Sequence, residues 1–212
     1  MMKESEKPDL DGVARLYSGS LEEHGSVARG VGWNEADDHQ LRFEKLTTVF
    51  GRKDEEIAVN DLGCGYGALY EYLRATGRSV RTYRGYDISE PMLEMAEEKI
   101  PGEGVEFIQA GSIDKSADYS FASGIFNVRL EHDEALWRDH VLTTLDNLNQ
   151  FSTKGFAFNL LTSYVDFREE HLFYGDPLFF FDHCKRHLSP RVSLLHDYPL
   201  WEWTIVVRKA EP

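Results

Sequence analysis

Residues able to hold a ligand through their backbone lie between Val59 and Gly67, in the run Val-Asn-Asp-Leu-Gly-Cys-Gly-Tyr-Gly. Its glycines alternate at positions 63, 65 and 67, and without side chains they let a ligand approach the backbone N–H groups. An apolar run precedes this turn, and helical spacing begins at Ala68, so the positive end of a helix faces the same spot. The strand, turn and helix predict a site for a nucleotide or a nucleoside.

Asp61 distinguishes two classes of cofactor. Gly63, Gly65 and Ala68 fit the dinucleotide pattern G-x-G-x-x-G/A, which is weak alone. A carboxylate two residues before the first glycine repels a pyrophosphate and attracts the ammonium group of an amino-acid moiety. The turn also lies well inside the chain, whereas a dinucleotide domain usually opens with this strand. Both observations favour S-adenosylmethionine over NAD.

A second acid, Asp87, ends the next predicted strand, at 82–86, twenty residues after Gly67. An ionised carboxylate can accept both hydrogen bonds that a ribose diol offers. Ser89 and Pro91 are also typical of a helix start, so Asp87 has a second interpretation as an N-terminal helix acid. With the glycine turn beside it, the ribose is favoured.

Residues 41–209 resemble the class I S-adenosylmethionine-dependent methyltransferases. The resemblance depends on Asp-x-Gly-x-Gly-x-Gly at 61–67, on Asp-Ile-Ser-Glu-Pro-Met-Leu at 87–93, and on the order of the later elements. It implies S-adenosylmethionine as methyl donor, with S-adenosylhomocysteine as the product.

The resemblance also implies an adenine site bordered by Ile88 and Met92, although Met92 fits core packing as well. Family members often carry an acid after the third strand, here predicted at 104–112, and Ser112 stands at that position. A hydroxyl or a backbone carbonyl can accept the same hydrogen bond. We therefore expect Ser112 and Ile113 near the adenine, with Asp114 as a substitute after a two-residue shift.

Residues 1–50 are expected to form a helical cap or lid over the cofactor, and residues 51–212 the methyltransferase core. A helix is predicted over 38–50 from its apolar spacing. Within the cap, Tyr17 and Trp33 fit either a cofactor contact or core packing. Arg42 either binds the cofactor carboxylate, which suits a guanidinium, or lies on a solvated helix face.

The acceptor is expected where strand four, within 118–127, leaves the sheet. Ser123 to His132 then lie at the carboxyl edge, where open α/β folds bind ligands, and Ser123 is a candidate cofactor contact. The exit lacks the Asn/Asp-Pro-Pro-Tyr motif of enzymes that methylate adenine, cytosine or glutamine amides. Seven aromatic residues between Tyr164 and Phe181 indicate an aromatic-rich acceptor pocket.

Three residues are candidates for catalysis: His196, His171 and Tyr164. A base is useful when a hydroxyl or ammonium acceptor must lose a proton. For each histidine, a surface or turn-stabilising role is the alternative. No metal is expected, because His183-x-x-x-His187 lacks the glutamate of H-E-x-x-H. The helix stripe over 136–148 is interpreted as core.

Seven predicted strands position these residues. A short connection at 196–200 joins the last two, which requires the final strand, 201–207, to run antiparallel. The expected fold is an α/β three-layer sandwich with a mostly parallel seven-stranded sheet, and the resemblance implies the strand order 3-2-1-4-5-7-6. A reversed last strand is typical of methyltransferase sheets and not of dehydrogenase sheets.

Bulk composition agrees with a single domain of 212 residues. A formal net charge of −14 argues against nucleic acid, and neither a leader nor a membrane span is expected. Two cysteines suit a cytoplasmic protein. We expect a monomer or homodimer that methylates an oxygen or nitrogen atom of a small molecule. The alternatives are an NAD-dependent oxidoreductase and a non-catalytic cofactor-binding or interaction module.

Overall fold

A computed structural model gives the structure of the chain and describes residues 8–24, 36–51 and 55–209. One seven-stranded sheet has the order β3-β2-β1-β4-β5-β7-β6. The strands are β1 (Ile57–Leu62), β2 (Val80–Asp87), β3 (Val105–Gln109), β4 (Ala117–Ala122), β5 (Ser152–Leu161), β6 (Arg191–Leu195) and β7 (Glu202–Arg208). β7 runs antiparallel to both β5 and β6, and the other pairs are parallel. The predicted strand order and reversed last strand are confirmed.

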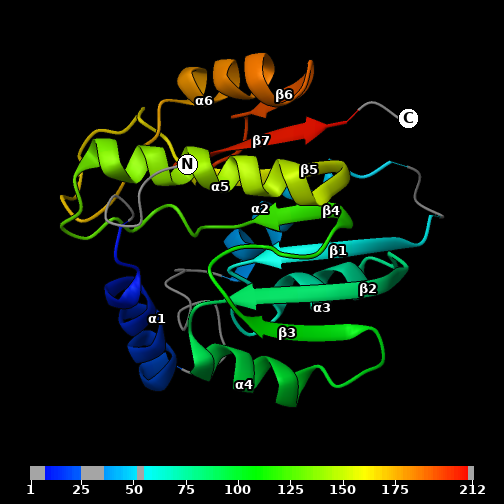
Figure 1. The fold of residues 1–212 in the computed structure, drawn as a ribbon. Helices are drawn as coiled ribbons and strands as arrows, with labels where there is room; N and C mark the ends of the chain where they lie inside the picture. Colours follow the sequence, from blue (N-terminus) through cyan, green and yellow to red (C-terminus); the bar gives the residue numbers. More distant parts are fainter. Residues whose placement is uncertain (1–7, 25–35, 52–54, 210–212) are drawn as a thin grey trace.

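Helices cover both faces of the sheet and give the predicted three layers. In Figure 1, α5 and α6 lie in front of the sheet, while α2 and α3 lie behind it. The helices are α1 (Asp11–His24), α2 (Ala36–Thr47), α3 (Ala68–Ala75), α4 (Glu90–Lys99), α5 (Glu134–Phe151) and α6 (Pro177–His183), which continues as a π-helix, η3 (Cys184–Leu188). Helix α1 falls within the region expected to be helical, although the sequence did not give its bounds, and it lies on the side toward which β1 to β4 point (Figure 1).

Two apolar clusters fill the spaces between the layers, because successive strand residues face opposite sides of the sheet. One cluster, under α5 and α6, includes Trp137, Phe158 and Phe180. The other, under α2 and α3, includes Leu46 and Leu69. Every residue of the central strands β1 and β4 is buried, which is typical of parallel strands covered on both faces. The sheet is therefore a firm support for loops at its carboxyl edge.

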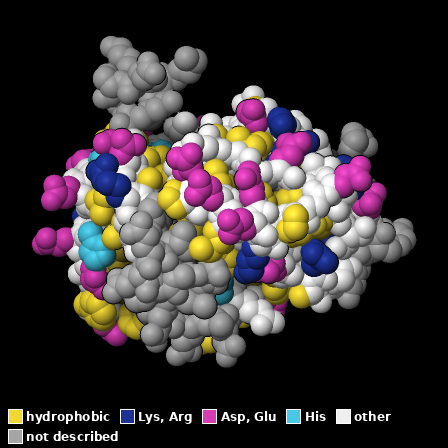
Figure 2. All heavy atoms as spheres, turned by 90° about the horizontal axis from the view of Figure 1, so that it is seen from below, with side chains coloured by type: hydrophobic (Ala, Val, Ile, Leu, Met, Phe, Trp, Pro, Cys, Tyr) yellow, Lys and Arg dark blue, Asp and Glu magenta, His cyan; other side chains and the backbone are white. Residues whose placement is uncertain are grey.

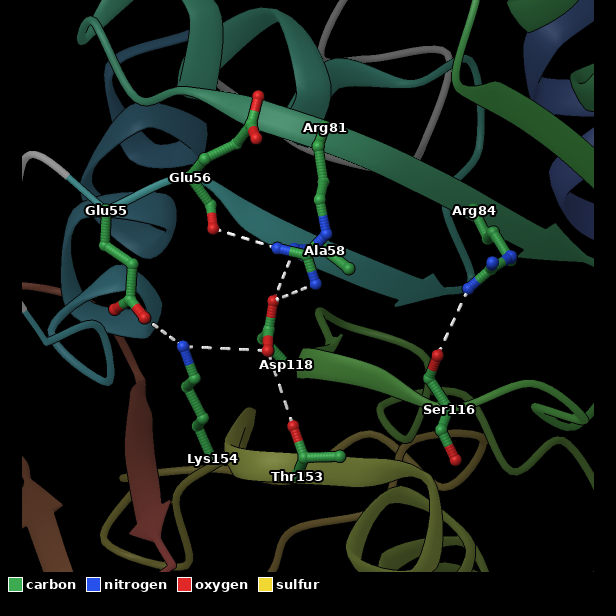
Figure 3. A network of polar contacts seen from close by, with 9 residues as sticks. All are labelled: Glu55, Glu56, Ala58, Arg81, Arg84, Ser116, Asp118, Thr153 and Lys154. Atoms are coloured by element: carbon green, nitrogen blue, oxygen red, sulfur yellow. Dashed lines mark hydrogen bonds and ion pairs between the residues drawn. The ribbon is translucent and has the colours of Figure 1, made fainter. Parts of the chain in front are cut away.

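Asp118 ties the amino-terminal ends of the central strands together (Figure 3). Its Oδ2 accepts a hydrogen bond from Ala58 N at 2.7 Å and pairs with Arg81 at 2.7 Å. Its Oδ1 lies 3.7 Å from Lys154 Nζ, and Lys154 also pairs with Glu55. This network joins β1, β2, β4 and β5 at the edge opposite the glycine turn.

The surface of the protein is acidic, as the composition predicts. More acidic than basic side chains are visible on the face drawn in Figure 2, in keeping with the net charge of −14. Among the described residues, no helix is both long enough and apolar enough to cross a bilayer. The described residues also contain no group of three or more His, Cys, Asp or Glu side chains suited to a metal ion.

Candidate active site

The glycine turn connects β1 to α3 at the carboxyl edge of the sheet. Gly63, Gly65 and Gly67 have φ values of 74°, 52° and 83°, in the left-handed region that favours glycine. The N–H groups of Gly63 and Cys64 both donate to Tyr86 O, at 2.7 and 3.1 Å. The turn is therefore fixed to the end of β2, where the second predicted acid lies.

Asp87 is already hydrogen-bonded to this turn. Its Oδ2 accepts the N–H of Gly65 at 2.8 Å, and its Oδ1 accepts the N–H of Ser89 at 2.9 Å. Burial raises the pKa of Asp87, while the backbone hydrogen bonds from Ser89, Gly65 and Ile88 act in the opposite direction. Ser89 itself caps α4 by accepting the N–H of Met92. These bonds agree with the helix-start interpretation of Asp87. Its ribose interpretation stays a prediction, for which each oxygen keeps a further lone pair.

Asp61 is buried below the turn, and its Oδ2 accepts a 2.5 Å hydrogen bond from the hydroxyl of Tyr83. Burial raises the pKa of Asp61 to about 7, with the charge of Asp87 raising it further and the Tyr83 bond lowering it. A cation placed beside Asp61 would lower the pKa of its carboxyl again and favour the ionised carboxylate. The role of Asp61 as a site for an ammonium group stays a prediction.

A cavity joins these groups into one site. It is bounded by the glycine turn, the ends of β2 and β4, the segment after β3, and helices α1, α2 and α5. Its lining residues are Leu10, Val13, His39, Phe43, Asp61, Leu62, Gly63, Cys64, Gly65, Tyr66, Ala68, Leu69, Asp87, Ile88, Met92, Ala110, Gly111, Ser123, Gly124, Ile125, His140 and Thr144. Of the predicted cofactor residues, it includes Asp61, Gly63, Gly65, Asp87, Ile88, Met92 and Ser123.

Proteins with similar sequences are described as methyltransferases. Residues 60–138 match the family described as a methyltransferase domain. The Mycobacterium tuberculosis (strain ATCC 25618 / H37Rv) protein named "Putative methyltransferase Rv1506c" is 50% identical over 159 residues, which cover 74% of this chain and 95% of that protein. The chain belongs to the class I S-adenosylmethionine-dependent methyltransferases. It is an enzyme whose methyl donor is S-adenosylmethionine, and the alternatives of an NAD-dependent oxidoreductase and a non-catalytic module are set aside.

Solved structures share the fold of this methyltransferase at low sequence identity. Magnesium protoporphyrin IX methyltransferase (ChlM) from Synechocystis PCC 6803, with bound SAH, gives a TM-score of 0.69 at 14% identity, covering 95% of this chain and 100% of that one. N-methyltransferase NodS from Bradyrhizobium japonicum WM9, in complex with SAH, gives 0.64 at 13% identity, covering 92% and 99%. These similarities support the fold.

Arg42 lies neither on a solvated helix face nor in the lining of the cavity, the two places that the sequence suggested. The residue is only 6% exposed, so it is not on a solvated helix face. Its guanidinium binds the carboxylate of Glu202, with Nη2 2.7 Å from Oε1. Arg42 is not among the residues that line the methyltransferase cavity. Its charge is compensated from β7, by a partner that no local sequence pattern indicates.

After β3, the segment meets the cavity one or two residues before the predicted adenine contacts. Ala110 and Gly111 line the cavity, and Ser112 and Ile113 do not. The backbone N–H of Ile113 donates to Asn147 Oδ1 at 2.9 Å, and its carbonyl accepts the Asn147 side-chain amide at 2.9 Å. That pairing holds the segment to α5.

The methyltransferase cavity also contains residues that the sequence did not assign to it. His39 and Phe43 enter from α2, and His140 and Thr144 from α5. Burial, with a smaller effect of Arg42, lowers the pKa of His39 to about 4. His39 and Phe43 are four positions apart and therefore lie on one face of α2, and this spacing was the signal in the sequence that they share a site. The interpretation of the α5 stripe as core alone is wrong for His140 and Thr144.

The predicted catalytic residues lie outside the cavity lining. Tyr164 is 65% exposed, and its ring lies 5.9 Å from that of His196, which is also exposed. His171 is exposed beside Glu169, at 3.7 Å. Trp33 and the side chain of Tyr17 fall outside the described residues. The aromatic residues of segment 164–181 are of two kinds. Phe173 and Phe180 lie in the core, while Tyr164 and Phe167 are on the surface.

Proposed function

We propose that the cavity binds S-adenosylmethionine with its ammonium group at Asp61, its ribose at Asp87 and its adenine between Ile88 and Met92. The observation that supports this most is that a buried carboxylate, Asp61, and a half-buried one, Asp87, line the same cavity as the glycine turn. A sulfonium nucleoside has a cationic amino-acid end and a sugar diol, which suit one acid each.

The residues that line the cavity disfavour a dinucleotide with its pyrophosphate group. Among the described residues that border the cavity there is no Lys or Arg, so a pyrophosphate would meet two carboxylates and no cation. The same argument applies to the acceptor. We propose an acceptor without multiple negative charges, methylated on an oxygen or nitrogen atom. Similar folds carry such reactions, since NodS is named an N-methyltransferase.

We propose further that an imidazole of the cavity, His39 or His140, accepts the proton of an acceptor that must lose one. The methyl of a sulfonium needs little activation, so most of the rate comes from holding the acceptor in line with the carbon–sulfur bond. Catalytic roles for Tyr164 and His196, which are exposed and lie outside the cavity lining, stay predictions. A role for His171 stays a prediction, as do the cytoplasmic location, the monomeric or homodimeric state and the absence of nucleic-acid substrates.

Calorimetry with S-adenosylmethionine, S-adenosylhomocysteine and NAD tests the cofactor placement. We expect the two sulfur nucleosides to bind and NAD not to. Asp87→Ala should weaken binding by about 1–3 kcal/mol, because buried donors of the ribose lose their acceptor. Asp139→Ala, on the exposed side of α5, is the matched control and should bind as wild type does. Wild-type affinity in Asp87→Ala would remove the ribose assignment.

Transfer of a labelled methyl group to a panel of amines, alcohols, phenols and carboxylic acids tests the acceptor class. Product on an amine or hydroxyl supports the proposal. Product on carboxylic acids alone would contradict the role of an imidazole, because a carboxylate needs no base.

A further inference from the structure

A buried ion pair connects the cap helix α2 to the last strand of the sheet. The Nε of Arg42 lies 2.9 and 2.8 Å from the two carboxylate oxygens of Glu202, and its Nη2 lies 2.7 Å from Oε1. Arg42 is 6% exposed and Glu202 1% exposed. Such a pair gains little net stability from its charges, because both groups lose their hydration. Its retention in an apolar interior therefore calls for another explanation, such as fixing one arrangement of the elements.

Asn159 on β5 continues the chain of contacts in a fixed direction. Its Nδ2 donates to Glu202 Oε2 at 2.8 Å, and its Oδ1 accepts the N–H of Gly124 at 2.7 Å. A carboxylate only accepts, so the amide must turn its donor toward Glu202 and its acceptor toward Gly124. Flipping the amide would break both bonds. Asn159 is fully buried, which makes each lost bond costly.

Both ends of this chain lie at walls of the methyl-donor cavity. At one end, Arg42 stands beside Phe43 and one helical turn after His39, both of which line the cavity from α2. At the other end, Gly124 and its neighbour Ile125 line the cavity at the exit of β4. Four elements far apart in the sequence, α2, β7, β5 and the β4 exit, are thus linked through these side chains.

We propose that Arg42, Glu202 and Asn159 are positioning residues that hold helix α2 and the β4 exit together as one wall of the cavity. The inference rests on the cofactor placement proposed above. Helix α2 is then a fixed part of the site and not a lid that opens. Because a hydrogen-bonded chain with two charged members has one favourable arrangement, displacement of α2 also releases Gly124. Cofactor contacts made by either wall are strengthened by the other.

Hydrogen–deuterium exchange tests the coupling without knowledge of the acceptor. The variant is Arg42→Met/Glu202→Gln, which removes both buried charges and keeps an amide oxygen that can accept from Asn159. We expect the exchange rate of residues 122–128, which contain no altered position, to rise by about fivefold or more. Asn159→Ala should produce the reciprocal effect in α2. Both variants should bind S-adenosylhomocysteine with a Kd raised by about fivefold or more.

Asn60→Ala is the matched control, since Asn60 is a fully buried asparagine on β1 whose Nδ2 donates to Lys115 O at 2.7 Å, outside this chain. We expect it to lower the Tm and to leave exchange in α2 and in residues 122–128 unchanged. Unchanged exchange at 122–128 in the folded double variant would overturn the proposal, and so would an equal rise in Asn60→Ala. Failure of the wild-type protein to bind S-adenosylhomocysteine would instead contradict the cofactor placement.

Discussion

Ile125 packs on Gly63 so closely that a β-carbon at Gly63 would lie 2.0 Å from Ile125 Cγ2. The contact brings the exit of β4 directly onto the glycine turn after β1. Glycine is therefore required at position 63 for two reasons: its φ is 74°, and there is no room for a side chain. The first reason is local, while the second comes from a residue 62 positions later in the chain.

Gly63→Ala is expected to lose stability for both reasons. The left-handed conformation costs about 1–2 kcal/mol for a residue with a β-carbon. Overpacking against Ile125 adds about 1–3 kcal/mol. Gly77 is the matched control, because its φ of 72° is similar and a β-carbon added there would have nothing within 4 Å. Urea unfolding should show a clearly larger loss at Gly63, and equal losses in the two variants would contradict the steric argument.

Asp118→Asn is expected to lower the free energy of unfolding by about 1–3 kcal/mol at pH 7, since the buried N–H of Ala58 and the partly exposed Arg81 lose a charged acceptor (Figure 3). Burial alone would raise the pKa of Asp118, but the hydrogen bonds from Ala58 and Arg81, with the charges of Arg81 and Lys154, outweigh it and lower the pKa. The stabilisation is therefore present above the ordinary carboxyl pKa and is lost as the pH falls through the lowered value.

Unfolding measured from pH 2 to pH 7 checks this pH dependence. The difference between wild type and Asp118→Asn should shrink as the pH falls below about 4. Glu106→Gln provides the control, because that carboxylate is 48% exposed and pairs with Lys115 at the surface. Its variant should stay within about 0.5 kcal/mol of wild type. A difference at Asp118 that persists unchanged to pH 2 would show that the charge contributes nothing.

The glycine turn and the direction of the last strand could be predicted because their signals are local, while the strand order came from the resemblance to the methyltransferase family. Alternating glycines, an acid two residues before them and a second acid after the next strand depend only on neighbouring positions. The short connection between the last two strands likewise fixes the direction of β7. By contrast, α1 has no strong signal, since its sequence is polar and Val13 is its only described residue in the buried clusters.

The misplaced residues depend on contacts that a single sequence does not display. Arg42 and Glu202 are separated by 160 positions, and neither position differs in local pattern from a solvated charge. Ile113 lies in the core with its backbone bonded to Asn147, a partner on α5 that no spacing rule identifies. For His39, the spacing gives the buried face of α2, but only the packed structure shows that the cavity meets that face.

His39→Gln is expected to reduce methyl transfer about tenfold or more while changing the Kd for S-adenosylhomocysteine less than about threefold, the split expected for a proton acceptor. Burial lowers the pKa of His39 to about 4, so the ring is neutral at pH 7 with a lone pair available, and it is a weaker base than a free imidazole. Its contribution should be constant above about pH 6 and decline as the pH falls toward 4.

The control for His39 is His187→Gln, an exposed histidine on η3. It should retain wild-type transfer rates with the same acceptor from the panel. A rate profile of His39→Gln that matches wild type at every pH would transfer the assignment to His140, whose own substitution is the next measurement.

Asp61 is expected to make cofactor binding depend on pH. Burial raises the pKa of this carboxyl to about 7, and the charge of Asp87 contributes in the same direction. An ammonium group beside Asp61 favours the ionised form, so binding below pH 7 releases a proton. Affinity for S-adenosylmethionine should therefore increase from pH 5.5 to about 7 and then level off, with a limiting slope of about tenfold per pH unit.

The same raised pKa sets the sign of the stability effect in the ligand-free protein. Asp61 binds its proton more tightly when folded than when unfolded, so its contribution is full below about pH 4 and is lost as the pH rises through about 7. Asp61→Asn, permanently neutral, should bind weakly, with no pH dependence from this position and a Tm that declines less toward pH 8. Calorimetry at pH 6 in two buffers of different ionisation enthalpy measures the proton directly. Equal apparent enthalpies in the two buffers would mean that no proton is released, and that the ammonium group lies elsewhere.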